Sequence, residues 1–338
     1  MKFLIVVLML CICLASCEKT VEPPTDITSL QKFVAWNEAP TNAFTDLIHY
    51  NGAYYCVFRE ASSHISYDGR LRVIKSANGI NWNSFSLLSL PDKDLRDPHF
   101  FYDNNNSLSI TANARNKKDQ RETVIYKLQN SNFIQSKNIN VDNDYWLWSF
   151  SRFKDSLYTI GYNTFQPCFN SIESQKPKIA LFKNVDPACT SFSNVTVENM
   201  INNNFHCPNE ASIVFTPDSN LIAIVRDAPA LGKSHFGISK FPFKNWTWKE
   251  FPYYVRGPKL ALLPDGNLFL CAGSMIDVDK TYYAIINPQD FSVEKIKFFP
   301  SAGDSGYPGV IIEGSTALVS YYSSYQGNSR VYIVRITY

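Results

Sequence analysis

The sequence predicts an all-β fold, a six-bladed β-propeller, and three observations support this prediction. First, the 338-residue chain has no long helical period and consists of short apolar runs that end at Asn, Asp and Gly turns. Second, one unit recurs six times: an apolar strand, a tight polar turn and a second strand. Third, the turns lie near residues 52, 104, 155, 218, 265 and 313, so successive turns are 47 to 63 residues apart, which is the period of a propeller blade.

Each predicted hairpin is centred on a turn whose residues favour chain reversal. In chain order the hairpins are 47–59 around Asn51-Gly52, 99–113 around 103–106, 148–162 around Lys154-Asp155, 211–226 around Pro217-Asp218, 260–273 around 264–266, and 309–322 around Glu313-Gly314. One small sheet cannot bury both faces alone, so we expect neighbouring blades to bury them mutually and ring closure to protect the edges. An irregular β-sandwich is the alternative, but sandwich turns recur at much shorter spacing.

The composition excludes several classes of protein. With 32 Lys and Arg against 30 Asp and Glu, the formal charge is +2, which gives no basic surplus for nucleic-acid binding. An apolar content of 45% is too high for a disordered chain, and the 14% aromatic content favours strands. The length allows two ordinary domains or one large β domain, and the six-fold repeat favours one.

The first residues predict a processing signal. Met1-Lys2 is a short basic start, and the apolar run 3–14 is too short to span a bilayer comfortably. It ends in a segment, 14–17, that resembles the bacterial lipobox, which implies cleavage after residue 16 and lipidation of Cys17. An ordinary secretory signal cut near Ala15 is the alternative. We therefore expect a signal peptide over 1–16, a lipidated linker over 17–35 and the propeller over 36–338.

This resemblance also implies a location. The lipid on Cys17 would be the only membrane contact of the protein. We expect it to hold the propeller at the bacterial cell envelope, at the outer membrane, on its periplasmic or its surface side.

The chain has 8 cysteines, three of them within the first 17 residues. Cys56 and Cys271 lie in strand-like runs and are expected to be packed thiols. Cys168, Cys189 and Cys207 lie in loop-like sequence, where one disulfide is possible outside the cytoplasm, with the pair left open. No Cys or His spacing resembles a zinc site, and we expect neither a metal nor a cofactor.

The repeat also predicts where a site lies. Equivalent strand ends of a propeller surround one axis, and here they are Arg59, Asn113, Tyr162, Arg226, Gly273 and Tyr322. Most of these side chains can form hydrogen bonds, and a buried arginine needs a partner or a ligand. A ring of such groups around a funnel is a candidate binding site.

Several segments resemble the sialidase (neuraminidase) superfamily. Segment 76–82 resembles the Asp-box, with Asn78 in place of the usual Asp, and in that family this motif marks the outer turn of a blade. Segment 209–226 resembles the family's segment with a catalytic Glu, here Glu210, and a carboxylate-binding Arg, here Arg226. Segment 305–309 resembles the one that holds the Tyr nucleophile, here Tyr307. With 58–64, 95–98 and the closing strands, the resemblance spans about residues 40–338.

The resemblance implies an exo-acting glycoside hydrolase that releases terminal sialic acid or a related acidic sugar from a glycan. The carboxylate on the substrate's anomeric carbon repels a carboxylate nucleophile, so such enzymes use a neutral tyrosine instead. Tyr307 would attack while Glu210 removes its proton. Arg226 would bind the substrate carboxylate through charge-assisted hydrogen bonds.

The chain departs from the family's arginine triad at two places. The segment 42–47, where the first arginine is expected, contains Asp46 and no arginine, and Ser274 and Lys280 stand near the third position. The predicted substrate-binding residues are therefore Arg226 together with Arg59, Arg96, Arg256, Asp97 and Tyr322.

The acid/base is left open between His64 and Asp68, with Asp97 as a third candidate. Two other functions are also left open. A non-catalytic glycan-binding lipoprotein fits the incomplete triad. A neutral-sugar hydrolase with paired carboxylates on a five-bladed propeller is disfavoured by the six hairpins.

Overall fold

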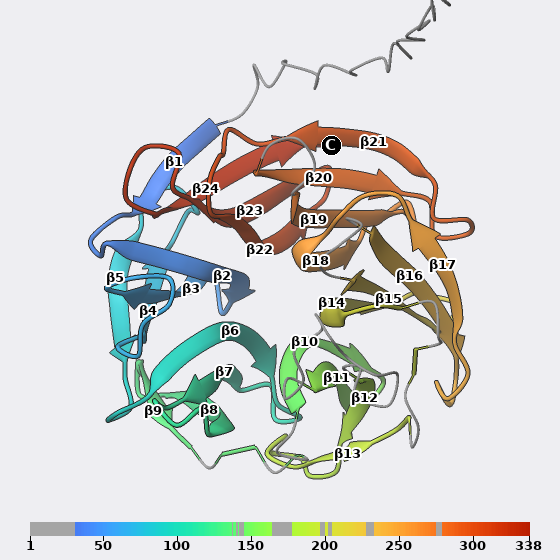
Figure 1. Ribbon diagram of the computed structural model, residues 1–338, viewed down its shortest axis with the longest axis horizontal. Coiled ribbons are helices and arrows are strands. Elements are labelled where there is room, and N and C mark those ends of the chain that lie inside the picture. The colour runs from blue at the N-terminus through green and yellow to red at the C-terminus, as the bar shows by residue number, and fades with distance from the viewer. Residues whose placement is uncertain are drawn as a thin grey trace, which may run out of the picture.

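The computed structural model describes residues 31–338 except 137, 140, 142–144, 164–177, 197–199, 202–204, 228–232 and 275–278. Over this part of the chain, 24 strands form six four-stranded antiparallel sheets that surround a common centre (Figure 1). The predicted six-bladed β-propeller is confirmed. The signal peptide and Cys17 lie outside the described residues, so the predicted lipidation stays a prediction.

Each blade is built from four strands that run outward from the centre, in chain order in blades 1 to 5 and with β1 as the outermost strand in blade 6. Blade 1 contains β2 (Thr41–Tyr50), β3 (Ala53–Ala61), β4 (Arg70–Ser76) and β5 (Asn83–Leu88), and blade 2 contains β6 (Asp94–Tyr102), β7 (Leu108–Arg115), β8 (Arg121–Gln129) and β9 (Asn132–Gln135). Blade 3 contains β10 (Tyr145–Phe153), β11 (Ser156–Asn163), β12 (Ile179–Asn184) and β13 (Phe192–Asn194), and blade 4 contains β14 (Pro208–Phe215), β15 (Asn220–Asp227), β16 (Lys233–Lys240) and β17 (Thr247–Phe251). Blade 5 contains β18 (Arg256–Leu262), β19 (Leu268–Ser274), β20 (Lys280–Ile286) and β21 (Val293–Phe298), and blade 6 contains β22 (Ser305–Glu313), β23 (Thr316–Ser323), β24 (Arg330–Thr337) and β1 (Gln31–Trp36).

The last blade closes the ring with a strand from the other end of the chain. β1 pairs antiparallel with β24, with Gln31 opposite Arg335 and Val34 opposite Tyr332. The linker predicted over 17–35 therefore ends earlier, because residues from 31 onward already belong to the sheet. The sequence did not predict this, because a strand whose partner lies some 300 residues away carries no local turn signal.

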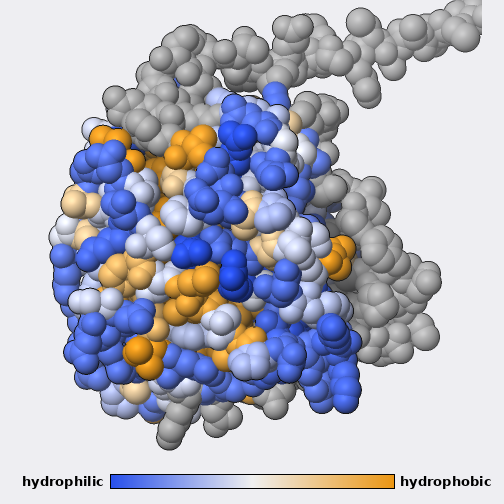
Figure 2. All heavy atoms as spheres, turned by 90° about the vertical axis from the view of Figure 1, so that its left-hand side faces the viewer, coloured by the Kyte–Doolittle hydropathy of each residue, from blue (hydrophilic) through white to orange (hydrophobic). Residues whose placement is uncertain are grey.

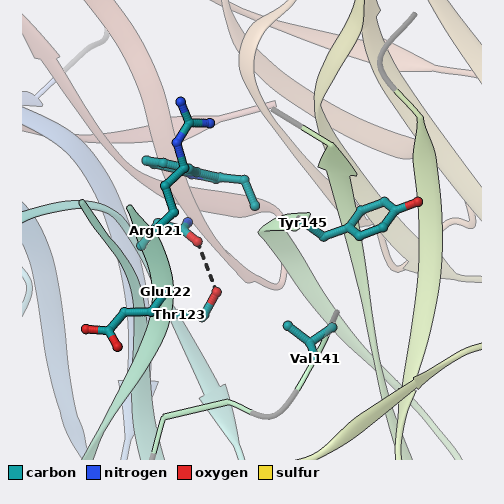
Figure 3. Close-up of a pocket in the computed structure, with 7 residues that line it drawn as sticks. Arg121, Glu122, Thr123, Val141 and Tyr145 are labelled. Atoms are coloured by element: carbon teal, nitrogen blue, oxygen red, sulfur yellow. Dashed lines mark hydrogen bonds between the residues drawn. The ribbon is translucent and has the colours of Figure 1, made fainter. Parts of the chain in front are cut away.

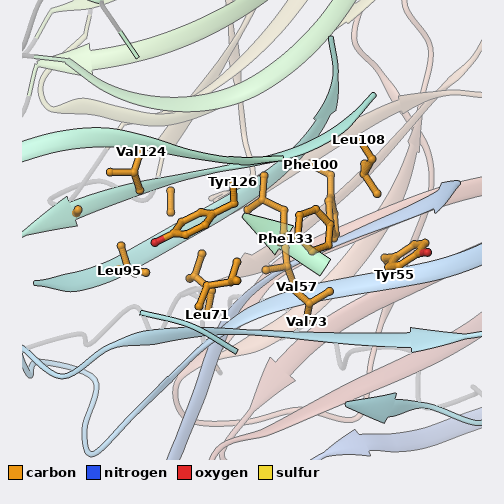
Figure 4. Close-up of a cluster of buried hydrophobic side chains, with 14 of the residues drawn as sticks. Tyr55, Val57, Leu71, Val73, Leu95, Phe100, Leu108, Val124, Tyr126 and Phe133 are labelled. Carbon is orange, nitrogen blue, oxygen red and sulfur yellow. The ribbon is translucent and has the colours of Figure 1, made fainter. Parts of the chain in front are cut away.

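Each of the six interfaces between neighbouring blades has its own apolar cluster. Between blades 1 and 2, Val57 and Leu71 from one sheet pack against Leu95 and Val124 from the next (Figure 4). All four are fully buried, and burying one such side chain stabilises the fold by about 1.5–3 kcal/mol. The blades therefore bury one another's faces around the whole ring.

The side of the ring that Figure 2 shows is mostly polar. On the side where β5 lies, apolar side chains are scattered among hydrophilic ones (Figure 2). Over the described residues, no helix is long and apolar enough to cross a membrane. Cys56, Cys189 and Cys271 are buried free thiols, whereas Cys207 is disulfide-bonded.

An ion pair joins the inner strands of blades 1 and 5. Asp46 Oδ1 lies 2.8 Å from Lys259 Nζ, and Asp46 Oδ2 accepts a 2.8 Å hydrogen bond from the backbone N–H of Phe100. Farther along the same strands, a cavity of about 230 Å³ opens beside Ile48 and Tyr102. The segment 42–47, where the family's first arginine was expected, thus contributes Asp46 to an ion pair between blades and to the lining of this cavity.

Candidate functional site

Every inner strand carries a β-bulge near its start, where the six strands meet at the ring centre (Figure 1). In blade order the bulges hold Phe44-Thr45, Asp97-Pro98, Trp148-Ser149, Asn209-Glu210, Gly257-Pro258 and Tyr307-Pro308. A bulge adds one residue to a strand and redirects its side chains. Phe44, Asp97 and Tyr307 have φ of 60°, 47° and 49°, values that are uncommon outside glycine and cluster at functional sites.

Tyr307, Glu210 and Arg226 meet at this centre. Tyr307 Oη donates a 2.6 Å hydrogen bond to Glu210 Oε1, and Arg226 Nη1 lies 2.6 Å from the same oxygen. Burial, reinforced by the charge of Glu210, raises the pKa of Tyr307 well above its usual value. The phenol is therefore protonated near neutral pH and needs a base to react. The structure brings these three predicted residues together from blades 4 and 6.

Two residues that the sequence did not predict fix the geometry of this cluster. The backbone N–H of Gly257 donates a 2.7 Å hydrogen bond to Glu210 Oε2. Gly257 has φ of 53°, and a Cβ there would lie 2.5 Å from the Tyr307 ring, so another residue would displace the tyrosine. Arg226 Nε donates a 2.6 Å hydrogen bond to Tyr254 Oη, which orients the guanidinium. The Gly-Pro pair that opens β18 was the only sequence signal for Gly257.

Aromatic rings enclose Tyr307. Its ring centroid lies 4.8 Å from that of Phe44, 5.9 Å from that of Trp148 and 5.9 Å from that of Tyr322. The predicted substrate-binding residue Tyr322 is fully buried, and its hydroxyl donates to Asp304 at 2.7 Å. Its place is therefore behind Tyr307, not on a surface that a sugar would contact.

Asp97 lies in the bulge of blade 2 and faces the same centre. It is buried, and its Oδ2 accepts a 3.0 Å hydrogen bond from Trp146 Nε1. Burial raises the pKa of Asp97 to about 6; the charge of Arg96 opposes the rise and that of Glu210 adds to it. A carboxyl group with this pKa exchanges a proton near neutral pH, which suits contact with a sugar hydroxyl or proton transfer.

Trp146 is itself held by its surroundings. The guanidinium of Arg121 lies 5.6 Å from the centre of its ring. Beside it a small cavity of about 10 Å³ is lined by Val141 and Tyr145, where Thr123 Oγ1 donates a 3.2 Å hydrogen bond to Asn113 Oδ1 (Figure 3). Such a cavity holds one water at most, so it carries no ligand site.

Replacing Asp97 with asparagine is expected to stabilise the protein at pH 7.5 but not at pH 4. The folded-state pKa of about 6 exceeds the ordinary value of 3.8, so the folded protein keeps a proton that the unfolded chain loses between these values. Stability is therefore lost as the pH rises through this window, by on the order of 3 kcal/mol at pH 7.5, and Asp97→Asn removes the effect. Urea unfolding at both pH values measures it. An equal difference between variant and wild type at pH 4 and pH 7.5 would contradict this assignment.

A buried carboxylate supports the rim beside the centre. Asp94 is fully buried and contacts three guanidiniums: Arg59 Nε at 2.7 Å from Oδ1, and Arg96 Nη1 and Arg115 Nε, each 3.2 Å from Oδ2. A Cβ on Gly69 would lie 1.9 Å from Asp94 Oδ1, so only glycine fits against this group. The four charged residues form what we call the Asp94 cluster.

The Asp94 cluster holds the 62–69 loop that connects β3 to β4. Arg59 Nη1 donates to the carbonyl of Ser63 at 3.1 Å, and Arg59 Nη2 to Ser66 Oγ at 3.0 Å. Arg96 Nη1 donates to the carbonyl of His64 at 3.1 Å. Because the Arg59 side chain is fully buried and bonded to these groups, it supports the loop and does not reach a ligand, contrary to the predicted substrate contact.

The two predicted acid/base residues of this loop have different surroundings. His64 Nδ1 lies 2.6 Å from Asp304 Oδ2, and the ring packs 5.4 Å from that of Phe44, beside Tyr307. Asp68 instead accepts the backbone N–H of Ser62 within the loop. Although burial opposes it, hydrogen bonds from Ser66 and Ser62 hold the pKa of Asp68 below its usual range. The structure therefore makes Asp68 a capping group of an exposed loop, contrary to the predicted catalytic role.

Arg256 reaches the rim from the start of β18. Its Nη2 donates a 2.6 Å hydrogen bond to the carbonyl of Ser305, and its Nη1 lies 3.6 Å from Asp279 Oδ1. Its Nε is buried and has no partner among the described residues. Ala43 occupies the inner strand of blade 1 opposite Arg59, so no arginine stands there. Of the predicted arginines, Arg96, Arg226 and Arg256 therefore lie at the centre or its rim.

No group of three or more His, Cys, Asp or Glu side chains is arranged to hold a metal ion within the described residues. A hydrogen-bonded phenol and carboxylate, flanked by guanidiniums, match the requirements of nucleophilic catalysis with a general base.

Comparison with known proteins supports the fold at the level of structure only. No protein-family model matches the chain, and no curated protein matches it significantly. Among solved structures, a protein of unknown function from Dyadobacter fermentans has a TM-score of 0.75 at 16% identity, covering 92% of this chain and all (100%) of that one. The Hadza microbial sialidase Hz136 has a TM-score of 0.68 at 12% identity, over 88% of this chain and 66% of the sialidase. The fold is that of the sialidase-like six-bladed propellers.

The same fold also carries a different specificity. The Penicillium chrysogenum α-L-arabinanase, solved with arabinobiose, has a TM-score of 0.67 at 11% identity, over 88% of this chain and 94% of the arabinanase. The six-blade count therefore does not by itself disfavour a neutral sugar, contrary to the expectation from the six hairpins. The sialidase and the arabinanase are glycoside hydrolases of different specificity, whereas the Dyadobacter fermentans protein has no stated function.

Proposed function

We propose that this protein is an exo-acting glycoside hydrolase that releases a terminal acidic sugar, sialic acid or a relative, from a glycan. One observation carries the proposal: the 2.6 Å hydrogen bond from Tyr307 Oη to Glu210 Oε1, with Arg226 on the same oxygen. A tyrosine and a glutamate joined in this way are a nucleophile and its base.

Each residue has a role that its surroundings support. Tyr307 attacks the anomeric carbon while Glu210 takes the phenolic proton, and the Gly257 N–H stabilises the carboxylate before the transfer. A neutral phenol suits an anionic sugar, because a carboxylate nucleophile would be repelled. The guanidiniums of Arg226 and Arg256 supply the positive charge that an acidic substituent needs, and Asp97 is placed to bind a hydroxyl group.

The experiment that tests the proposal compares turnover on a panel of 4-methylumbelliferyl glycosides, including an α-sialoside and an α-L-arabinofuranoside. We expect the wild type to cleave the sialoside and Glu210→Gln to lower kcat by roughly 10²–10⁴-fold. Glu250→Gln, at an exposed ion pair with Lys233, is the matched control and should act like the wild type.

The panel also separates the alternatives. Cleavage of the arabinofuranoside alone would overturn the acidic-sugar specificity. The catalytic role of the Tyr307–Glu210 pair would then be tested by Glu210→Gln on that substrate. No turnover of any glycoside, with glycan binding retained, would contradict the hydrolase and favour the glycan-binding protein that the incomplete arginine triad also fits.

A further inference from the structure

A histidine and a carboxylate from opposite ends of the chain meet beside Tyr307. His64 lies in the loop between β3 and β4, and Asp304 immediately precedes β22. His64 Nδ1 and Asp304 Oδ2 are 2.6 Å apart, and no described residue bonds His64 Nε2. The His64 side chain is 44% exposed, so the imidazole is open to solvent.

Asp304 is held on both of its oxygens. Tyr322 Oη donates a 2.7 Å hydrogen bond to Oδ1, while Oδ2 faces His64. Burial opposes it, but the hydrogen bond and charge of His64, the Tyr322 hydroxyl and the charge of Arg256 keep the pKa of Asp304 below its usual range. An ionised carboxylate only accepts hydrogen bonds, so His64 Nδ1 must donate its N–H, and Nε2 is the nitrogen that can exchange a proton with a ligand.

The pair is anchored to the nucleophile through aromatic contacts. The Phe44 ring packs edge-on against His64 at 5.4 Å and against Tyr307 at 4.8 Å. Tyr322 contacts Tyr307 at 5.9 Å and bonds Asp304, which lies three residues before Tyr307 in the chain. The histidine, its carboxylate and the nucleophile are therefore parts of one packed group.

The loop that carries His64 is fixed rather than loose. Arg96 Nη1 donates to the His64 carbonyl, and Arg59 holds the neighbouring Ser63 carbonyl, each at 3.1 Å. The charged groups that face His64 are Asp304 from the segment before β22 and Arg96 from β6, and Arg256 from β18 acts on Asp304. The arrangement thus holds the imidazole in one place.

We propose that His64 is the proton donor and acceptor for the leaving group and that Asp304, itself bonded by Tyr322, is its positioning residue. This proposal rests on the proposed hydrolase function. It assigns the acid/base role to a histidine and not to either of the carboxylates Asp68 and Asp97. It also names two partners, Asp304 and Tyr322, that the sequence did not place in this role.

The reaction has two steps, in which the bond between Tyr307 and the sugar forms and is then hydrolysed. As Tyr307 Oη attacks the anomeric carbon and Glu210 takes its proton, the bond to the glycosidic oxygen breaks, and that oxygen takes the electron pair. His64 Nε2–H protonates it, and the alcohol leaves. Neutral His64 then takes a proton from water, whose oxygen attacks the anomeric carbon. The bond to Tyr307 breaks, and Glu210 returns the proton to the phenolate.

The test uses one sugar on leaving groups of different acidity, a highly acidic nitrophenol and a simple alcohol. His64→Gln is expected to lower kcat/KM for the alkyl glycoside by roughly 10²–10⁴-fold but for the nitrophenyl glycoside by less than about tenfold. Added azide should raise turnover of the nitrophenyl glycoside by His64→Gln, because an anion can attack the anomeric carbon without a base. His206→Gln, at an exposed histidine that also faces an aspartate, is the matched control and should leave both rates unchanged.

Asp304 is tested by the pH profile, which a purely structural role would not move. Asp304→Asn removes the anion that stabilises the imidazolium, so the alkaline limb of kcat/KM should shift to lower pH. Asp304→Glu should restore part of the shift.

Three results are decisive. An inactive wild type would overturn the proposed function itself. If the wild type were active and needed Tyr307, but His64→Gln lowered kcat/KM equally for both leaving groups, only the assignment of His64 would be overturned. If Asp97→Asn removed the alkaline limb of the kcat/KM pH profile and Asp304→Asn did not change it, the acid role would belong to Asp97.

Discussion

Replacing Tyr307 with phenylalanine is expected to lower kcat for the cleaved glycoside by about 1000-fold or more. The change removes the one oxygen that Glu210 Oε1 contacts at 2.6 Å and leaves the ring that packs on Phe44. Steady-state kinetics on the fluorogenic substrate measure the loss. The thermal midpoint should change little, because the ring and its contacts remain.

A matched tyrosine distinguishes loss of the nucleophile from loss of any buried hydroxyl. Tyr126 is buried in the cluster between blades 1 and 2, and no described residue bonds its hydroxyl. Tyr126→Phe should keep full activity and equal or greater stability, because it removes an unpaired buried polar atom. A Tyr307→Phe protein that retains more than about a tenth of wild-type kcat would contradict the nucleophile assignment.

Replacing Asp94 with asparagine is expected to lower the free energy of unfolding by about 3–5 kcal/mol. Asp94 is the shared anion of Arg59, Arg96 and Arg115, and both Asp94 and Arg59 are fully buried. Without the carboxylate, these guanidiniums repel one another around an Arg59 side chain that is fully buried. Urea unfolding at pH 7, followed by tryptophan fluorescence, measures the change.

An exposed ion pair is the control for Asp94. Asp119 lies 2.7 Å from Arg121, but its side chain is 56% exposed, so Asp119→Asn should change the free energy of unfolding by less than about 1 kcal/mol. Equal effects of the two substitutions would show that the Asp94 cluster is no more than a surface pair. Because Arg59 and Arg96 hold the carbonyls of the 62–69 loop, Asp94→Asn should also weaken any step that depends on His64.

The hairpin repeat predicted the inner half of every blade but gave no signal for the outer half. The first two strands of each blade are apolar and separated by a tight turn, so their hairpins were visible locally. Outer strands such as β5 and β21 are short or half-exposed and have no clear period. β1 was assigned to the linker for a related reason, since only its pairing with β24 makes it a strand.

The site was predicted in part, and through resemblance more than spacing. Tyr307, Glu210 and Arg226 were found because their neighbours resemble known segments, and the structure brings them within hydrogen-bonding distance. Asp304, Tyr254 and Gly257 were missed, because their partners lie in other blades and nothing in their own segments marks them. The roles of Arg59 and Asp68 could not be decided from the sequence, because an arginine at a strand end and an aspartate before glycine look alike whether they face a ligand or their own loop.

The sequence by itself determined the repeat, and with it a single closed ring, the near-neutral charge and an aromatic-rich interior. These are local properties, since turn chemistry and strand alternation act over a few residues. Only the tertiary structure decided which side chains meet at the centre, because the six bulges bring residues from six distant segments to one point. It also decided which charges are satisfied internally: Arg59 is bound by Asp94, whereas His64 and Asp304, 240 residues apart, become one pair. Which side chains are buried, and which ion-pair partners they have, are properties of the folded ring and cannot be assigned from any segment alone.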